Sequence, residues 1–202
     1  MACYLRGTRI LIPHGEVCIE AVQIGQYVST LDGPKAIRWI GRRSYSREFI
    51  FGNRDVLPVR IERGALGLGL PRRDLCVSPQ HALLIDGSLI PASALVNGVS
   101  IRQDTGVDAV SYFHLQFDSH AVIFAEGAAA ESFVDDYSRA MFDNVADYAA
   151  RFPLAIREPA RFCAPRIEKG VELEIVRRRL TQRSPRSGKP ADWSGGLRVG
   201  VN

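Results

Sequence analysis

Three side chains of this sequence could together rearrange a peptide bond. Cys3 offers a thiol near the start of the chain, and Ser78 and His81 lie three residues apart in the tetrapeptide 78–81. The thiol can attack the carbonyl that precedes it, an N-to-S acyl shift that gives a thioester, if the departing amide nitrogen gains a proton. A histidine with a pKa near neutrality can supply that proton, and a serine hydroxyl can polarise or hold the scissile amide.

The spacing of Ser78 and His81 predicts that both lie on one tight turn, because the proline between them fixes its backbone. A cysteine and a Ser-Pro turn also occur in many proteins that have no such activity. Spacing alone therefore leaves a catalytic and a purely structural interpretation open.

The remaining histidines are weaker candidates. His120 follows Asp118 by two residues. It could assist the same reaction or form an edge pair with Asp118 on the solvent face of a sheet, and the sequence favours neither. We expect His114 to be structural, and His14, which lies in a predicted hairpin turn, to be solvated.

The cysteines show no metal-binding or disulfide pattern. Cys3, Cys18, Cys76 and Cys163 fall at irregular intervals without a CxxC pair, which excludes a finger-type zinc site. A domain of this size can build its own core, so a disulfide scaffold is not expected. Cys18 and Cys76 stand in apolar runs and are expected to be buried. The reaction considered above needs neither a metal nor an organic cofactor.

Short strands separated by tight turns must position these groups. Between residues 9 and 124, short apolar runs alternate with turn signals such as Asp86-Gly87, and no helical period interrupts them. This pattern predicts an all-β body. The predicted strands include residues 10–12, 36–40, 57–61, 81–85 and 112–117, and the glycine-rich segment 65–73 is predicted to be an exposed loop.

A weak internal repeat relates residues 11–28 to residues 84–101. Each copy has an apolar pair, a glycine hairpin, a short polar crossover and a glycine before another strand. Two copies of one unit suggest a pseudo-symmetric β fold, although glycine hairpins are common enough that a chance similarity stays open.

After Ser132 the hydrophobic period becomes helical. Apolar residues recur every three or four positions over residues 133–148, which predicts a helix with one buried face. Leu173, Val176 and Leu180 predict a short second helix that ends in three arginines. From residue 181 onward, Ser, Pro, Gly and Arg dominate and predict disorder. We therefore expect a domain over residues 3–132, a helical extension over 133–180 and a disordered basic tail over 181–202.

Charge is distributed unevenly between the two parts of the chain. Of the 202 residues, 46% are hydrophobic and 24% charged, as in globular proteins. Residues 1–150 hold 14 Lys and Arg against 17 Asp and Glu, net −3, and residues 151–202 hold 12 against 5, net +7. A basic tail on a mildly acidic body does not indicate a nucleic-acid-binding protein. No apolar stretch approaches the roughly 20 residues of a membrane span, and no signal peptide is evident. We expect a cytoplasmic protein or one secreted by a non-classical route.

Four segments carry a family resemblance. Residues 3–10 read Cys-Tyr-Leu-Arg-Gly-Thr-Arg-Ile, residues 20–28 read Glu-Ala-Val-Gln-Ile-Gly-Gln-Tyr-Val, residues 78–81 read Ser-Pro-Gln-His, and residues 113–127 run from Phe-His-Leu-Gln to Ala-Glu-Gly. In this order they resemble the motifs of Hint domains, the module shared by hedgehog C-terminal domains and inteins, and they look most like bacterial standalone Hint domains. The resemblance implies a horseshoe-shaped all-β fold with pseudo-two-fold halves.

The resemblance also implies roles. Cys3 would be the nucleophile and His81 the general acid for the departing amine. Ser78 would orient and polarise the scissile amide, and His120 would help water or an external nucleophile to resolve the thioester. The partner would be a polypeptide attached before Cys3. The expected function is self-cleavage before Cys3, and the alternative is a catalytically silent β module that serves folding, secretion or binding.

Three departures qualify this expectation. Inteins end in His-Asn and a nucleophile, whereas residues 131–133 read Glu-Ser-Phe, so no asparagine can cyclise and full splicing is disfavoured. The aspartate with which hedgehog domains activate a sterol is matched only by Asn53, with Asp55 two residues later, so sterol transfer is unsupported. Only Met1 and Ala2 precede Cys3. The chain could be a fragment of a longer precursor, could release a dipeptide, or could have lost the activity.

Overall fold

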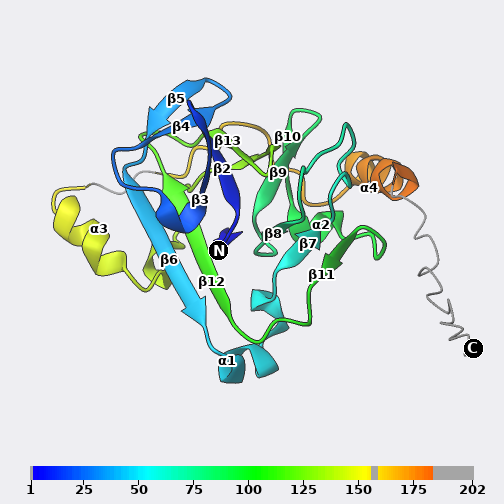
Figure 1. Cartoon of the computed structure of the whole chain (residues 1–202), viewed down its shortest axis with the longest axis horizontal. Coiled ribbons are helices and arrows are strands. Elements are labelled where there is room, and N and C mark those ends of the chain that lie inside the picture. The colour runs from blue at the N-terminus through cyan, green and yellow to red at the C-terminus, as the bar shows by residue number, and fades with distance from the viewer. Residues whose placement is uncertain (1, 156–158, 184–202) are drawn as a thin grey trace, which may run out of the picture.

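Two antiparallel β-sheets form the body of the protein (Figure 1). The computed structural model describes residues 2–155 and 159–183. The six strands of the first sheet are β1 (Tyr4–Leu5), β6 (Trp39–Tyr45), β7 (Val59–Ile61), β8 (Leu75–Val77), β11 (Ile101–Gln103) and β12 (Val110–Gln116). The eight strands of the second are β2 (Arg9–Ile12), β3 (Gly15–Cys18), β4 (Tyr27–Thr30), β5 (Gly33–Ala36), β9 (Ala82–Ile85), β10 (Ser88–Pro91), β13 (Val122–Ala125) and β14 (Ala128–Glu131). The expected all-β body is confirmed.

The strand order brings the start of the chain into the middle of the molecule. The first sheet runs β11-β7-β8-β1-β12-β6, so the two-residue strand β1 lies between β8 and β12. The second runs β10-β9-β14-β13-β2-β3, with β4 paired to β13 and β5 to β4. The N-terminal end of the described chain therefore lies near the centre of the view in Figure 1.

The strand expected over residues 36–40 is divided between the two sheets. Ile37 donates its backbone N–H to Gln26, whereas Arg38 donates to Gln116. Gln26 directly precedes β4 of the second sheet, and Gln116 ends β12 of the first, so the chain crosses between the sheets here and a single continuous strand is not formed.

The internal repeat is confirmed in its order of elements. In the first copy, β2 and β3 form a hairpin that leads into the one-turn helix η1 (Ile19–Ala21) and then β4. In the second, β9 and β10 lead into α2 (Ala92–Leu95) and then β11. The last strand differs, because β4 joins the second sheet and β11 the first. Between the copies lie α1 (Arg47–Gly52), the one-turn helix η2 (Arg54–Val56) and the predicted loop over 65–73, whose Leu68 is exposed.

Burial of the apolar residues agrees only in part with the sequence. Trp39 and Phe113 are buried. Cys18 and Cys76 are only partly buried, contrary to expectation. Cys18 ends the edge strand β3, and Cys76 lies opposite Arg60 on the face of β8 that points away from buried Leu75 and Val77.

The predicted helix over residues 133–148 is wrong. Only the one-turn helix η3 (Arg139–Met141) and α3 (Val145–Arg151) form in this region. Phe133 donates its backbone N–H to Leu115, which keeps it extended beside β12. The rings of Phe133, Phe142 and Tyr148 pack around Trp39 with centroids 5.2–5.6 Å away. The apolar period reflects this aromatic packing and not a continuous helix.

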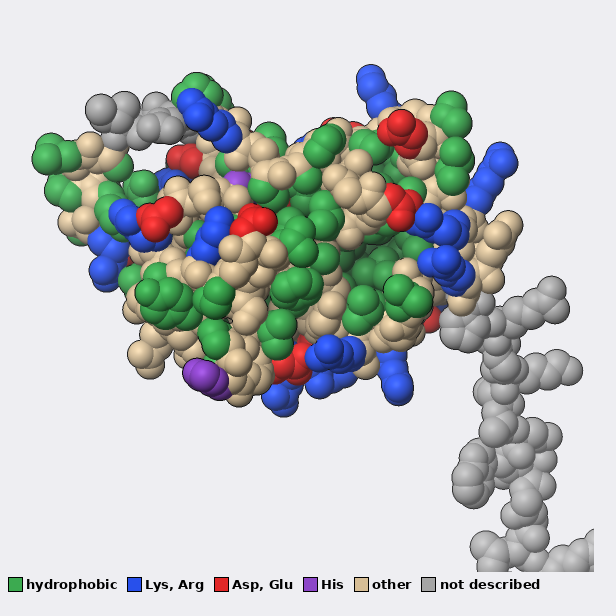
Figure 2. All heavy atoms as spheres, turned by 90° about the horizontal axis from the view of Figure 1, so that it is seen from above, with side chains coloured by type: hydrophobic (Ala, Val, Ile, Leu, Met, Phe, Trp, Pro, Cys, Tyr) green, Lys and Arg blue, Asp and Glu red, His purple; other side chains and the backbone are tan. Residues whose placement is uncertain are grey.

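The second predicted helix is confirmed. It is α4 (Val171–Arg183), at the opposite end of the molecule from α3 (Figure 1), and Leu173, Val176 and Leu180 are buried. Residues 181–183, expected to be disordered, are its last residues, and the remainder of the predicted tail lies outside the described residues. On the face shown in Figure 2, hydrophobic side chains gather across the middle, and charged side chains of both signs are interspersed around them. Within the described residues, no helix is long and apolar enough to cross a membrane.

Candidate functional site

Cys3 and Ser78 are joined by two hydrogen bonds. The amide of Cys3 donates to Oγ of Ser78 at 2.8 Å, and the amide of Ser78 donates to the Cys3 carbonyl at 2.8 Å. Cys3 directly precedes β1 and Ser78 directly follows β8, and these strands pair through Tyr4 and Val77. The sheet therefore brings the amide before Cys3 onto the predicted catalytic turn.

The turn itself has the predicted geometry. The amide of His81 donates to the carbonyl of Ser78 at 3.0 Å, which closes a tight turn between β8 and β9. The side chain of His81 is fully buried, and neither ring nitrogen has a hydrogen-bond partner within the described chain. Its ring centroid lies 4.1 Å from that of Tyr4 and 5.1 Å from that of His114.

Burial determines the protonation of this site. It lowers the pKa of His81 to about 4, with Glu131 raising it and Arg166 and His120 lowering it. It also raises the pKa of the Cys3 thiol far above its usual value. The near-neutral pKa expected of the histidine is therefore wrong for this folded state. At neutral pH, both the thiol and His81 are uncharged.

His120 faces the interior, and its proposed edge pair with Asp118 is wrong. Nδ1 of His120 accepts the backbone N–H of Cys163 at 2.9 Å, and Nε2 lies 3.7 Å from Oε2 of Glu131. Because Nδ1 accepts, we assign the ring proton to Nε2. Asp118 instead pairs with Arg38 at 2.5 Å on the surface.

Glu131, which the sequence marked only as part of the segment 131–133, belongs to the site. Its carboxylate is buried at the end of β14, where Oε1 accepts the Ala82 amide at 2.7 Å. Burial opposes ionisation, but His120, His81 and Arg166 together with the Ala82 amide hold the pKa of Glu131 below its usual value. The available signal was a carboxylate that ends the otherwise all-alanine segment 128–131.

The other two histidines lie where they were expected. His114 is buried, with its ring between those of Tyr4 and Phe133 at 5.9 and 5.6 Å. Burial, His81 and His120 lower its pKa well below the usual value, so it is neutral. His14 is exposed. Tyr4, buried beside His81 and His114, donates its hydroxyl to the carbonyl of Glu131 at 2.8 Å.

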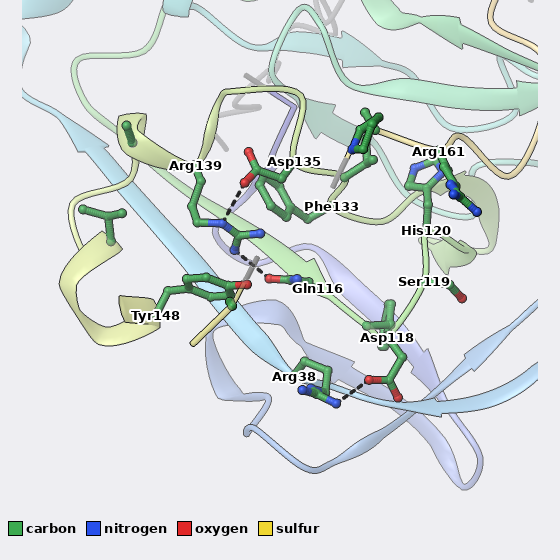
Figure 3. A pocket seen from close by; sticks show the side chains of 17 residues that line it. Arg38, Gln116, Asp118, Ser119, His120, Phe133, Asp135, Arg139, Tyr148 and Arg161 are labelled. Carbon is green, nitrogen blue, oxygen red and sulfur yellow. Dashed lines mark hydrogen bonds and ion pairs between the residues drawn. The ribbon is translucent and has the colours of Figure 1, made fainter. Parts of the chain in front are cut away.

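Pockets reach the site from different sides. One of about 830 Å³ is lined by His120 and Arg161 at one end and by Arg139 at the other, where Arg139 binds Asp135 and Gln116 (Figure 3). Another, of about 700 Å³, is lined by Ser78 together with Tyr45, Tyr112 and other residues. Tyr45 and Tyr112 also belong to the hydrophobic cluster that contains Cys3. Ser78 and His120 therefore each border a pocket, although both residues are buried.

A family model described as Hint domain matches residues 2–137. The chain belongs to the Hint-domain family. The match supports a self-processing domain as the general class of function. It includes Cys3, Ser78, His81, His120 and Glu131, whereas Cys163 and Arg166 lie outside it.

Solved intein structures resemble this Hint domain at low sequence identity. A DnaB intein from Synechocystis sp. PCC 6803 is 10% identical with a TM-score of 0.48, over 66% of this chain and 99% of that chain. A bacterial intein-like domain from Clostridium thermocellum is 13% identical with a TM-score of 0.45, over 66% and 99%. The gp41-1 intein is 14% identical with a TM-score of 0.45, over 64% and 98%. No curated protein matches the sequence.

The Hint domain holds its polar site without a cluster of metal ligands. No group of three or more His, Cys, Asp or Glu side chains within residues 2–155 and 159–183 is arranged to bind a metal ion. The cysteines of these residues are free thiols.

Proposed function

We propose that this Hint domain cleaves the peptide bond before Cys3 through an N-to-S acyl shift and a thioester. The observation that carries the proposal is the pair of hydrogen bonds between Cys3 and Ser78, through which the backbone of Cys3 contacts the turn that ends in His81. Sγ of Cys3 attacks the carbonyl carbon of residue 2. A carbon–sulfur bond forms, and the bond from that carbon to the Cys3 nitrogen breaks.

The acyl shift neither consumes nor releases a proton overall. The thiol loses one proton and the departing nitrogen gains one, so the shift needs no proton from outside. His81 is neutral, and its ring nitrogens have no partner among the described residues. It accepts the thiol proton and then delivers it to the nitrogen, acting first as base and then as the general acid.

Ser78 and His120 have supporting roles in this proposal. Because Oγ of Ser78 accepts the Cys3 N–H, it fixes the orientation of the amide, which is the orienting part of the role expected for it. His120 lies beside Glu131 and lines a pocket, so it can activate the water or small nucleophile that resolves the thioester. Cleavage then frees the polypeptide attached before Cys3.

A reporter fused before Cys3 tests the proposal. We expect slow release, accelerated by dithiothreitol or hydroxylamine because both attack thioesters, and no acceleration in Cys3→Ala. Cys18→Ala and Cys76→Ala are matched controls, since both thiols are partly buried in the same domain and should leave release unchanged. Mass spectrometry of the freed reporter should show the adduct of the added nucleophile at its carboxyl end. Equal release from the wild type and Cys3→Ala would reject the proposal and favour a catalytically silent module.

A further inference from the structure

The backbone on both sides of His81 is held by charged side chains. The carbonyl of Gln80 accepts Nη2 of Arg166 at 2.9 Å, and the amide of Ala82 donates to Oε1 of Glu131 at 2.7 Å. Nη1 of Arg166 in turn lies 3.1 Å from Oε2 of Glu131. These contacts close a ring that runs through His81, so its backbone is fixed from both neighbours.

The ion pair in this ring is sheltered from water. The side chain of Glu131 is 2% exposed and that of Arg166 is 21% exposed. The planar guanidinium uses two nitrogens for two acceptors, Gln80 and Glu131. A lysine carries one nitrogen and does not reproduce this fork. The arrangement therefore depends on arginine in particular.

Residues 165–167, which follow the β body, bring Arg166 next to Gln80 and Glu131. Leu89 of β10 donates its amide to Pro165 at 2.7 Å and accepts the amide of Ile167 at 3.0 Å, so this segment adds a short parallel bridge to β10. Earlier in the same segment, the Cys163 amide donates to His120. Residues 163–167 therefore lie against His120 and against the backbone next to His81.

We propose that Glu131 and Arg166 form a clamp that positions His81, which makes the segment around Arg166 part of the reacting unit. This inference rests on the proposed acyl shift, for which His81 must lie within proton-transfer reach of the thiol and the amide nitrogen. Displacement of a relay group by about 1 Å costs such a reaction on the order of 100-fold. Glu131 and Arg166 are positioning residues, because they act on the neighbours of His81 and not on the reacting atoms.

Cleavage kinetics test the clamp in the reporter fusion. Arg166→Met and Arg166→Lys should both slow thiol-induced release at least about 10-fold, because both lose the fork. The double variant Glu131→Gln/Arg166→Met should also be slow, and it avoids leaving a buried carboxylate unpaired. Arg177→Met is the matched control, since Arg177 of α4 also binds a backbone carbonyl of the body, that of Val96. We expect it to cleave within about twofold of the wild type, and a wild-type rate in all three Arg166 variants would overturn the clamp.

The pH response separates positioning from general stability. Arg166 lowers the pKa of His81 and Glu131 raises it. In a Cys3→Ala background, which cannot react, NMR titration of the His81 ring should give a higher midpoint in Arg166→Met and a lower one in Glu131→Gln. Arg166→Lys keeps the charge and should stay near the wild type, as should Arg177→Met. Unchanged midpoints in both charge-removing variants would contradict the clamp.

This second readout keeps two failures distinct. If the wild-type fusion shows no Cys3-dependent release, the proposed function is wrong, while the titration still decides whether Glu131 and Arg166 hold His81. Amide hydrogen exchange at Ala82 adds a direct measure, because its N–H donates to Glu131. Exchange should accelerate in Glu131→Gln and Arg166→Met and not in Arg177→Met. Equal protection in all variants would count against the clamp.

Discussion

The backbone amide of Cys163 donates a hydrogen bond of 2.9 Å to Nδ1 of His120. His120 therefore has one ring nitrogen committed to the chain that covers it, whereas neither nitrogen of His81 has a partner within the described residues. The two buried histidines differ in their freedom to accept and release a proton. We therefore expect His81 and His120 to serve different steps of the proposed reaction.

His81→Ala should slow the first step far more than His120→Ala. Without a proton relay, the Cys3 nitrogen would have to leave as an amide anion, and general acid–base help is typically worth ~10²–10⁴-fold. Thiol-induced release from the reporter fusion measures this step. His14→Ala, at an exposed histidine, is the control. A wild-type rate in His81→Ala would show that the assigned role is wrong.

A fusion with different tags at its two ends should release only the N-terminal tag. Ser132 donates its amide to the carbonyl of Ala121, and Ser132 Oγ accepts the Ala121 amide at 2.9 Å, so the residue after Glu131 is held within the sheet region. Neither a serine nor a carboxylate there can form the succinimide by which an asparagine cuts its own peptide bond. Mass spectrometry should find the domain still joined to its C-terminal tag. A ligated product of both tags above trace level would contradict this prediction.

Acid should destabilise the fold between about pH 6.5 and pH 4. The folded-state pKa of His81 is lowered to about 4, so in this range the unfolded chain binds more protons and the free energy of unfolding decreases as the pH falls. His81 alone accounts for a loss of about 2 kcal/mol at pH 5, and neutral buried His114 acts in the same direction. Glu131, whose pKa is also lowered, loses its contribution only at lower pH, as the pH falls through its folded value.

Urea unfolding at pH 7 and pH 5 measures this effect. His81→Gln should reduce the difference between the two conditions, because it removes the group whose protonation favours the unfolded state. His14→Gln should leave the difference unchanged, since His14 is exposed. An equal pH response in the wild type and His81→Gln would show that His81 titrates normally in the fold.

Arg139→Met should loosen the segment that follows the β body. The guanidinium of Arg139 lies 3.6 Å from the ring centroid of Tyr148 and also binds Asp135 and Gln116. Loss of a sheltered cation–π contact and these hydrogen bonds should cost about 1–3 kcal/mol. Chemical denaturation gives the cost, and limited proteolysis should show faster cutting near α3. Arg151→Met, at the exposed last residue of α3, should change neither, and equal effects of the two substitutions would contradict the prediction.

Local features of the sequence were sufficient for most of the strands, for the turn over residues 78–81 and for α4. A proline within a Ser-x-x-His spacing defines one turn, alternating apolar runs and glycine hairpins define strands, and Leu173, Val176 and Leu180 share one face of a helix. In each case neighbours within a few residues set the backbone conformation. The contact between Cys3 and Ser78 was also predicted, but the prediction rested on the resemblance to Hint-domain motifs and not on local conformation.

Only the tertiary structure decided the electrostatics of the site and the path of the segment after residue 132. The contact of Glu131 with Arg166 depends on Arg166 lying beside Leu89 of β10, and no hydrophobic periodicity in the sequence predicts this. The aromatic residues at 133, 142 and 148 have helical spacing, yet packing around Trp39 is stronger than their local preference. The low pKa of His81 arises from burial by segments far apart in sequence. Residue types and their spacing in the sequence indicate which groups can react. Their protonation and orientation depend on the residues that the whole fold packs against them.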